Sequence, residues 1–174
     1  MDKRKIEVFD NFLNPENFVK IQNEVLDSEF PWGYNDDICG HNEEQDKLDN
    51  CMFVHSVYKS QPKFYISPLF NTLTPLLNKL NIDSLCRIKI NLNLRTESHI
   101  EHCYHVDHKD VNFYSAIFYL NDNNGGTNIE GQPFIKSVAN RLIIFPSNVA
   151  HTGVTQTNTK RRVVINIIYT KHNG

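Results

Sequence analysis

The sequence predicts a mainly β protein with flanking helices, in which the helices come first and a sheet-rich core follows. Two observations favour this class. From residue 86 onward, short apolar runs alternate with turn residues, as in sandwiches and barrels. The first half instead holds two segments with helical spacing and one long stretch without a period. We therefore expect residues 86–174 to form the β core and residues 1–85 to support it.

The N-terminal segment predicts a short strand followed by a helix. Residues 5–13 begin as an alternating strand. Asn14 and Pro15 then form a favourable helix start, because Asn caps free N–H groups and Pro suits the first helical position. Apolar residues follow at helical spacing, at Phe18, Ile21 and Val25. These features predict an amphipathic helix over 15–28.

The rest of the first half predicts a loop and a second helix. Residues 29–50 combine proline, glycine and many charges with no clear period, so we expect a long loop there. Loops of this length often close over functional sites, so this segment is a candidate lid over the active site. A helix is expected within 68–80, with Thr74 as its N-cap.

The second half predicts a series of strands. From Arg87 to Leu94, polar and apolar residues alternate strictly, which indicates a half-buried strand. On its polar side we expect Asn91 and Asn93 to line a pocket, and Arg87 and Lys89 to face solvent. Further strands are expected at 114–120, 127–130, 133–138, 142–145 and 163–170.

Length and composition indicate one soluble domain over 1–174. A chain of 174 residues can bury a core without disulfides. Its net charge of −2 argues against a large nucleic-acid footprint, which requires excess lysine and arginine. No apolar signal-peptide core and no membrane-spanning run is visible. We expect a cytoplasmic protein with no nucleic-acid or membrane partner, and the sequence leaves its oligomeric state open.

The four cysteines give no sign of a zinc site. Cys39, Cys51, Cys86 and Cys103 form no CxxC pair. Without a secretory signal, we expect four reduced thiols that pack as small hydrophobic side chains.

The most informative motif is His105-Val106-Asp107, considered together with His151. Two residues apart on a strand, His105 and Asp107 present an imidazole and a carboxylate on the same face. His151 can complete a set of two histidines and one carboxylate, which non-haem Fe(II) oxygenases use with coordination positions left open. The pair Arg161-Arg162 can then supply a guanidinium for the carboxylate of an acidic cosubstrate.

The segment around this motif contains competing ligands. Histidines recur every three residues at positions 99, 102, 105 and 108, which would form one stripe on a helix. The strand patterns and turn signals on either side argue against a helix. A second triplet, His108-Lys109-Asp110, lies nearer a loop and has a lysine where a packed strand residue is expected. We therefore favour the first triplet.

The order of motifs resembles the prolyl 4-hydroxylase-like branch of the 2-oxoglutarate- and Fe(II)-dependent dioxygenases, including compact versions encoded by phages. The matching text is YHVD (104–107), AIFYLNDNNGGTNIEG (116–131) and RLIIFPSNVAHTGVTQTNTKRR (141–162). The opening VFDNFLNPENF is also similar to the first strand and helix of that family. The resemblance implies a double-stranded β-helix, the cupin-like jelly roll, as the core.

The resemblance also implies the site residues. His105, Asp107 and His151 would bind iron, and Tyr119 and Thr127 would line the cosubstrate pocket. The family often has a tyrosine on the strand before the H-x-D motif, where this chain has Leu92 and Leu94, so we expect Asn91 or Asn93 to substitute.

Two arginines compete for the distal carboxylate of 2-oxoglutarate. Spacing from His151 favours Arg161, as in many prolyl hydroxylases. Strand parity favours Arg162, which shares a face with Asn166, the polar residue within an apolar run. We lean to Arg162 and keep Arg161 as the alternative.

The implied activity is hydroxylation of a C–H bond, coupled to conversion of 2-oxoglutarate and O2 into succinate and CO2, with ascorbate as reductant. A peptidyl prolyl residue is the expected substrate. The alternatives are a free amino acid or other small molecule, and a non-catalytic cupin-like binding module. Repair of alkylated nucleic acid is less favoured, and zinc-dependent hydrolysis is a further competitor.

Overall fold

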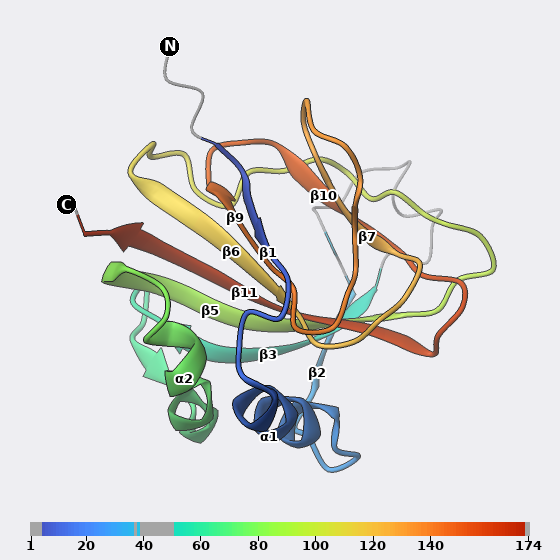
Figure 1. Ribbon diagram of the computed structural model, residues 1–174, viewed down its shortest axis with the longest axis horizontal. Helices are drawn as coiled ribbons and strands as arrows, with labels where there is room; N and C mark the ends of the chain where they lie inside the picture. Colours follow the sequence, from blue (N-terminus) through green and yellow to red (C-terminus); the bar gives the residue numbers. More distant parts are fainter. Residues whose placement is uncertain (1–4, 37, 39–50, 173–174) are drawn as a thin grey trace.

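A computed structural model describes residues 5–36, 38 and 51–172 and contains two antiparallel sheets (Figure 1). The larger has eight strands in the order β1-β9-β6-β11-β5-β3-β2, with β4 paired to β3. The smaller has the order β10-β7-β8. The strands are β1 (Glu7–Phe9), β2 (Gly33–Asn35), β3 (Met52–Lys59), β4 (Tyr65–Ile66), β5 (Ile82–Leu94), β6 (Phe113–Tyr119), β7 (Gly126–Ile129), β8 (Ile135–Lys136), β9 (Leu142–Pro146), β10 (His151–Val154) and β11 (Arg161–Lys171). This mainly β architecture confirms the predicted fold class and matches a jelly roll.

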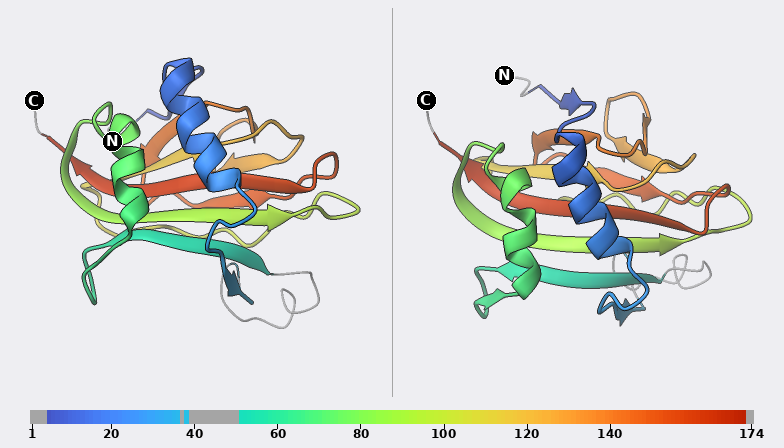
Figure 2. Two further views of the ribbon diagram at one scale, coloured as in Figure 1. Left: turned by 90° about the horizontal axis from the view of Figure 1, so that it is seen from below. Right: turned by 60° about the horizontal axis from the view of Figure 1, so that its bottom comes forward.

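The large sheet is covered on both faces. The helical elements α1 (Pro15–Leu26), η1 (Pro68–Leu73) and α2 (Thr74–Leu77) lie on one face, as Figure 2 shows for α1 and α2. Alternate residues of β11, including Ile165 and Ile167, join the buried cluster beneath them. Val164 belongs instead to a second cluster shared with Ile129 of β7, on the opposite face. Burial on both faces explains why the middle of β11, from Val163 to Ile168, is apolar except for Asn166.

Helix α1 forms where the sequence predicts it. The Asn14 side chain accepts a hydrogen bond from the Asn17 N–H at 2.8 Å, and Pro15 is the first helical residue. The buried residues of the helix are Phe18, Ile21 and Val25. The helix ends at Leu26, two residues before the expected end.

The second helical segment differs from the prediction. A 3-10 helix starts at Pro68 and runs into the single turn of α2. Ser67, rather than Thr74, provides the cap, because its hydroxyl accepts from the Leu69 N–H at 3.3 Å. Thr74 is the first residue of α2, so its expected role as N-cap is wrong.

Four strands were not expected, and one of them is the two-residue β4, which pairs with β3. Strand β3 lies between β5 and β2 in the large sheet, so the first half of the chain contributes to the β core. Strand β2 occupies part of the expected 29–50 loop, and most of the possible lid lies outside the described residues. Strand β10 begins at His151.

Two further expectations concern the cysteines and the membrane. Cys51 and Cys86 are free thiols, whereas Cys103 is disulfide-bonded, so the expectation of four reduced thiols is wrong. Among the described helices, none has the length and apolar character needed to cross a bilayer.

Candidate metal centre and adjoining pocket

The structure brings His105, Asp107 and His151 together. Their candidate ligand atoms all lie within 4.8 Å of one another. His105 and His151 face each other in an isolated β-bridge, in which each N–H donates to the partner's carbonyl at 3.0 and 2.9 Å. The bridge shows that His105 lies on extended backbone but outside a regular strand, unlike our expectation. It fixes the two imidazoles side by side, with ring centroids 4.5 Å apart.

The Asp107 carboxylate is held by three side chains from the large sheet. Arg87 of β5 donates to Oδ1 at 2.8 Å, while Ser115 of β6 and Asn166 of β11 donate to Oδ2 at 2.7 and 3.1 Å. Burial alone would raise the pKa of Asp107, but nearby His151, Arg87 and these hydrogen bonds hold it below its usual value. Asp107 is therefore ionised at neutral pH, as a metal ligand must be.

His151 is held in the form that binds a metal through Nε2. Its side chain is 3% exposed, and its Nδ1 lies 3.2 Å from the Val149 carbonyl. A carbonyl can only accept, so Nδ1 carries the proton and Nε2 keeps its lone pair. Nε2 faces Asp107 Oδ2 at 3.5 Å. Burial lowers the pKa of His151, which favours the neutral ring.

The competing triplet lies apart from this cluster. The ring of His108 packs on Phe113, with centroids 3.8 Å apart, and its Nδ1 accepts from the Asp110 N–H. The Asp110 carboxylate accepts from the Asn112 N–H, which closes a local turn. His99 contacts the Thr155 carbonyl at 2.7 Å. The described part of 99–112 contains no helix, in agreement with our rejection of a helical histidine stripe.

Arg162 projects into a pocket beside the metal cluster. Its side chain is 4% exposed and donates to Asn93 Oδ1 and Thr127 Oγ1, both at 3.2 Å. Tyr119 is fully buried behind this pair and donates to Thr127 at 2.7 Å. No carboxylate among the described residues pairs with Arg162. A buried guanidinium with only neutral partners is a strong candidate site for an anion.

Arg161 points elsewhere. Its guanidinium donates to the Leu26 carbonyl at 2.7 Å and so binds the C-terminal end of α1. That helix has no basic residue in its last turn, and Arg161 supplies the missing donor from β11. Adjacent strand residues point to opposite faces, which separates the two arginines.

The polar side of β5 forms one wall of the pocket. All four residues, Arg87, Lys89, Asn91 and Asn93, line it. The expectation that Arg87 and Lys89 face solvent is therefore wrong. The intervening residues Ile88, Ile90 and Leu92 are buried beneath the helices.

Several polar atoms of the pocket have no hydrogen-bond partner among the residues that the structure describes. They are Arg87 Nε, Asn91 Oδ1, Arg162 Nε and both ring nitrogens of His102. Buried polar atoms are normally paired, so this concentration fits a cavity shaped for a polar ligand. Burial, with a smaller contribution from Arg162, lowers the pKa of His102 to about 4, so its ring is neutral.

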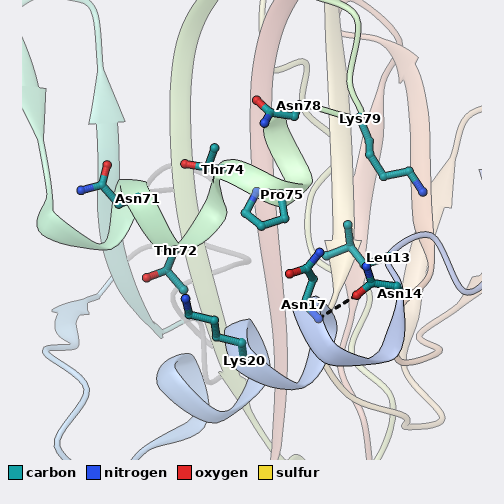
Figure 3. Close-up of a pocket in the computed structure, with 10 residues that line it drawn as sticks. All are labelled: Leu13, Asn14, Asn17, Lys20, Asn71, Thr72, Thr74, Pro75, Asn78 and Lys79. Atoms are coloured by element: carbon teal, nitrogen blue, oxygen red, sulfur yellow. Dashed lines mark hydrogen bonds between the residues drawn. The ribbon is translucent and has the colours of Figure 1, made fainter.

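A larger cavity lies between α1 and the η1–α2 segment, about 540 Å³ in volume (Figure 3). Its described lining consists of Asn, Thr, Lys, Leu and Pro side chains and includes no His, Cys, Asp or Glu. In Figure 3 the Asn14 amide points back to Asn17 as the helix cap. The described lining of this cavity therefore holds none of these ligand types, whereas that of the smaller pocket includes His105, Asp107 and His151.

The sequence did not indicate several residues of the site. Arg87, Ser115 and Asn166 hold Asp107, and His102 lines the pocket. Gly153 also lines it, where a Cβ would lie 3.6 Å from Arg162 Nη1. Only Asn166 gave a signal, as a polar residue within the apolar run of β11.

No protein-family model matches the sequence, and no curated protein matches it. Solved structures do match its fold. An oxidoreductase of the 2-oxoglutarate–Fe(II) oxygenase family from Burkholderia pseudomallei has a TM-score of 0.67 at 15% identity, over 97% of this chain and 86% of the other. A prolyl hydroxylase from Trichoplax adhaerens, solved with a peptide fragment of the hypoxia inducible factor oxygen degradation domain, scores 0.64 at 14% identity, over 98% and 85%. A non-haem α-ketoglutarate-dependent epimerase of nogalamycin biosynthesis scores 0.65 at 10% identity, over 97% and 78%. The chain therefore has the jelly-roll fold of 2-oxoglutarate–Fe(II) oxygenases, with a His-Asp-His cluster in it.

Proposed function

We propose that this protein is an Fe(II)- and 2-oxoglutarate-dependent dioxygenase that hydroxylates a C–H bond. One observation supports the proposal above all others. The His105–Asp107–His151 cluster and the buried Arg162, whose hydrogen-bond partners are neutral, line the same pocket. Neither feature alone specifies this chemistry. Together they provide a metal site for one end of 2-oxoglutarate and a cationic site for the carboxylate at its other end.

The donor set suits Fe(II). Two neutral imidazoles and one ionised carboxylate are the ligands that non-haem Fe(II) oxygenases use, with positions left for a cosubstrate and O2. The hydrogen bonds from Ser115 and Asn166 to Asp107 Oδ2 orient the carboxylate before a metal binds. His151 is oriented in the same way by the Val149 carbonyl.

Arg162 and its neighbours suit the distal carboxylate of 2-oxoglutarate. Arg162 offers a planar donor pair, and the hydroxyl of Thr127 lies beside it at 3.2 Å. Tyr119 positions Thr127 from behind. Asn91 and Asn93 line the same wall, and the unpartnered Asn91 Oδ1 is free to accept a hydrogen bond from a ligand. Arg161 takes no part, because it binds α1.

The chain's own contribution is to bind, orient and exclude water. When bound, Fe(II) supplies oxidative decarboxylation of 2-oxoglutarate with O2 and hydroxylation of the substrate, with ascorbate as external reductant. Ionised Asp107 and neutral His151 need release no proton to bind the metal. The buried Arg162 neutralises the cosubstrate where water would otherwise compete.

We propose a peptidyl prolyl residue as the substrate, supported by the sequence motifs and by the likeness to the Trichoplax hydroxylase. The epimerase of nogalamycin biosynthesis has the same fold, and it favours a small molecule as the second candidate. A non-catalytic binding module is the third.

The test is succinate formation. Anaerobically purified protein with Fe(II), ascorbate and 2-oxoglutarate is exposed to O2 and a panel of proline-containing peptides, and succinate and a one-oxygen mass gain are measured. Wild type should produce both, and His151→Ala neither.

If succinate forms but no peptide gains oxygen, the proposed dioxygenase activity is supported and a small molecule is favoured as the substrate. If wild type binds neither Fe(II) nor 2-oxoglutarate, the proposal is wrong and the binding module is favoured. Zinc in the anaerobically purified protein, with no exchange for iron, would point to hydrolysis.

A further inference from the structure

The pocket carries an excess of positive charge that the proposed cosubstrate does not use. Among its described lining residues, the charged side chains are the cations Arg87, Lys89 and Arg162 and the carboxylate Asp107. Arg87 pairs with Asp107 at 2.8 Å, and Arg162 is the proposed site for 2-oxoglutarate. Lys89 is left without an assigned role.

The strand register places Lys89 beside the metal cluster and away from Arg162. Its backbone lies opposite Asn166, which donates to Asp107, whereas Arg162 lies opposite Asn93. Lys89 and Asn93 are four residues apart on β5, about 13 Å along an extended strand. On its other side, Lys89 faces Ser56 of β3. Lys89 therefore occupies the β3 side of the pocket, next to the metal ligands.

The ammonium of Lys89 is poorly compensated. The side chain is half-buried and has no hydrogen bond or ion pair within the part of the chain that the structure describes. Burial, followed by the nearby charge of Arg87, lowers its pKa to about 8; Asp107 opposes this shift, and Lys59 adds the smallest lowering effect. At neutral pH the charged form still predominates. A partly desolvated cation of this kind is stabilised when an anion binds beside it.

We propose that Lys89, assisted by Arg87, binds a carboxylate of the substrate on the β3 side of the metal cluster. Arg87 contributes because its Nε is buried and unpartnered, while its Nη2 remains on Asp107. This inference rests on the proposed function, since it names the charge of the molecule that is hydroxylated. The carboxylate has two sources: a free amino acid, or an acidic side chain next to proline in a peptide.

The test measures binding to protein loaded anaerobically with Fe(II) and 2-oxoglutarate, by calorimetry. One pair of probes is the peptide Gly-Glu-Pro-Gly and its Gln counterpart, both with blocked ends. The other pair is free L-proline and L-prolinamide. Wild type should bind the acidic member of one pair about tenfold or more tightly, the range expected for a hydrogen-bonded ion pair. The pair that responds identifies the source of the carboxylate.

The variants assign the preference to Lys89. Lys89→Met keeps the length of the side chain without charge and should abolish the preference, while Lys89→Arg should restore much of it. Lys59→Met is the matched control, because Lys59 acts on Lys89 through its charge but is absent from the described pocket lining. It should retain the preference. Circular dichroism checks that each variant is folded.

No preference in either wild-type pair, or a preference that survives Lys89→Met, would overturn the inference. So would a Lys89→Met effect confined to the 2-oxoglutarate titration, which would place Lys89 on the cosubstrate. Failure of wild type to bind Fe(II) and 2-oxoglutarate would instead count against the proposed function, and the two failures are therefore distinct.

Discussion

Arg161 and Arg162 are neighbours on β11, yet their side chains leave the strand on opposite faces and meet different partners. Arg162 is buried against Asn93 and Thr127, and Arg161 donates to the Leu26 carbonyl at the end of α1. The sequence left the choice between them open, because distance from His151 and strand parity disagreed. The contact with α1 depends on how a remote helix packs, which local pattern does not reveal.

Arg162→Ala and Arg161→Ala should therefore fail in different ways. Loss of Arg162 removes a charged hydrogen-bond donor, worth about 1.5–3 kcal/mol, so 2-oxoglutarate should bind about 10–100-fold more weakly. Loss of Arg161 should leave that affinity unchanged and lower the free energy of unfolding by about 1 kcal/mol. Anaerobic 2-oxoglutarate titration and urea unfolding measure the two effects. A larger loss of cosubstrate affinity in Arg161→Ala would show that spacing from His151 outranks parity.

At the scale of elements, the double glycine before Thr127 lets two chain segments approach closely. A Cβ on Gly125 would lie 2.7 Å from the Val154 carbonyl oxygen and 2.9 Å from that of Thr155. A Cβ on Gly126 would collide with the Ile135 carbonyl of β8. Strand β7 carries Thr127 to Arg162, so this approach also shapes the pocket.

Gly125→Ala should lower the free energy of unfolding by about 1–3 kcal/mol, as expected for overpacking, and weaken 2-oxoglutarate binding. Gly33→Ala is the matched control. A Cβ there meets the Val54 carbonyl oxygen at an ordinary 3.4 Å, and its cost should stay within about 0.5 kcal/mol. Denaturant unfolding compares them, and equal costs would contradict the close-approach argument.

Strand β5 was predictable because its two faces differ in polarity, with Ile88 and Ile90 on the core side and Asn91 and Asn93 on the other. Strand β3 was missed because polar residues interrupt both of its faces. His55, on its helix side, is satisfied by the Pro31 carbonyl and the Ser67 hydroxyl, both at 3.0 Å. Sequence periodicity detects a strand when its two faces differ in polarity. It misses a strand such as β3, in which tertiary hydrogen bonds to polar side chains replace apolar contacts.

The same limit applies to the site. His105, Asp107 and His151 could be selected because their order along the chain is distinctive. Arg87 could not, because its residue type and its place at the start of the strand predicted from the sequence suggested a solvent-exposed side chain. Only the fold of residues 99–112 over the sheet brings Asp107 within 2.8 Å of it.

At the scale of the whole molecule, the metal cluster joins segments that are distant in sequence. Asp107 is bonded to side chains of β5, β6 and β11, and His105 is bridged to β10 of the smaller sheet. A metal bound by all three ligands would therefore connect both sheets. Because it binds the folded state, it should raise the stability of the whole fold by mass action.

Fe(II) with 2-oxoglutarate, added anaerobically at about 100 times its dissociation constant, should stabilise wild type by about 2.7 kcal/mol. For a chain of this size that corresponds to a rise in melting temperature of about 5–10 °C. His151→Ala should show no such shift.

His108→Ala is the matched control, because it deletes a nearby imidazole that contacts Phe113 and the Asp110 N–H. The melting temperature of His108→Ala without ligand should fall, but the rise caused by the ligands should remain, because His108 lies outside the cluster proposed to bind the metal. Loss of the shift in His108→Ala would instead assign the metal to the second triplet, and with it a different face of the 99–112 segment.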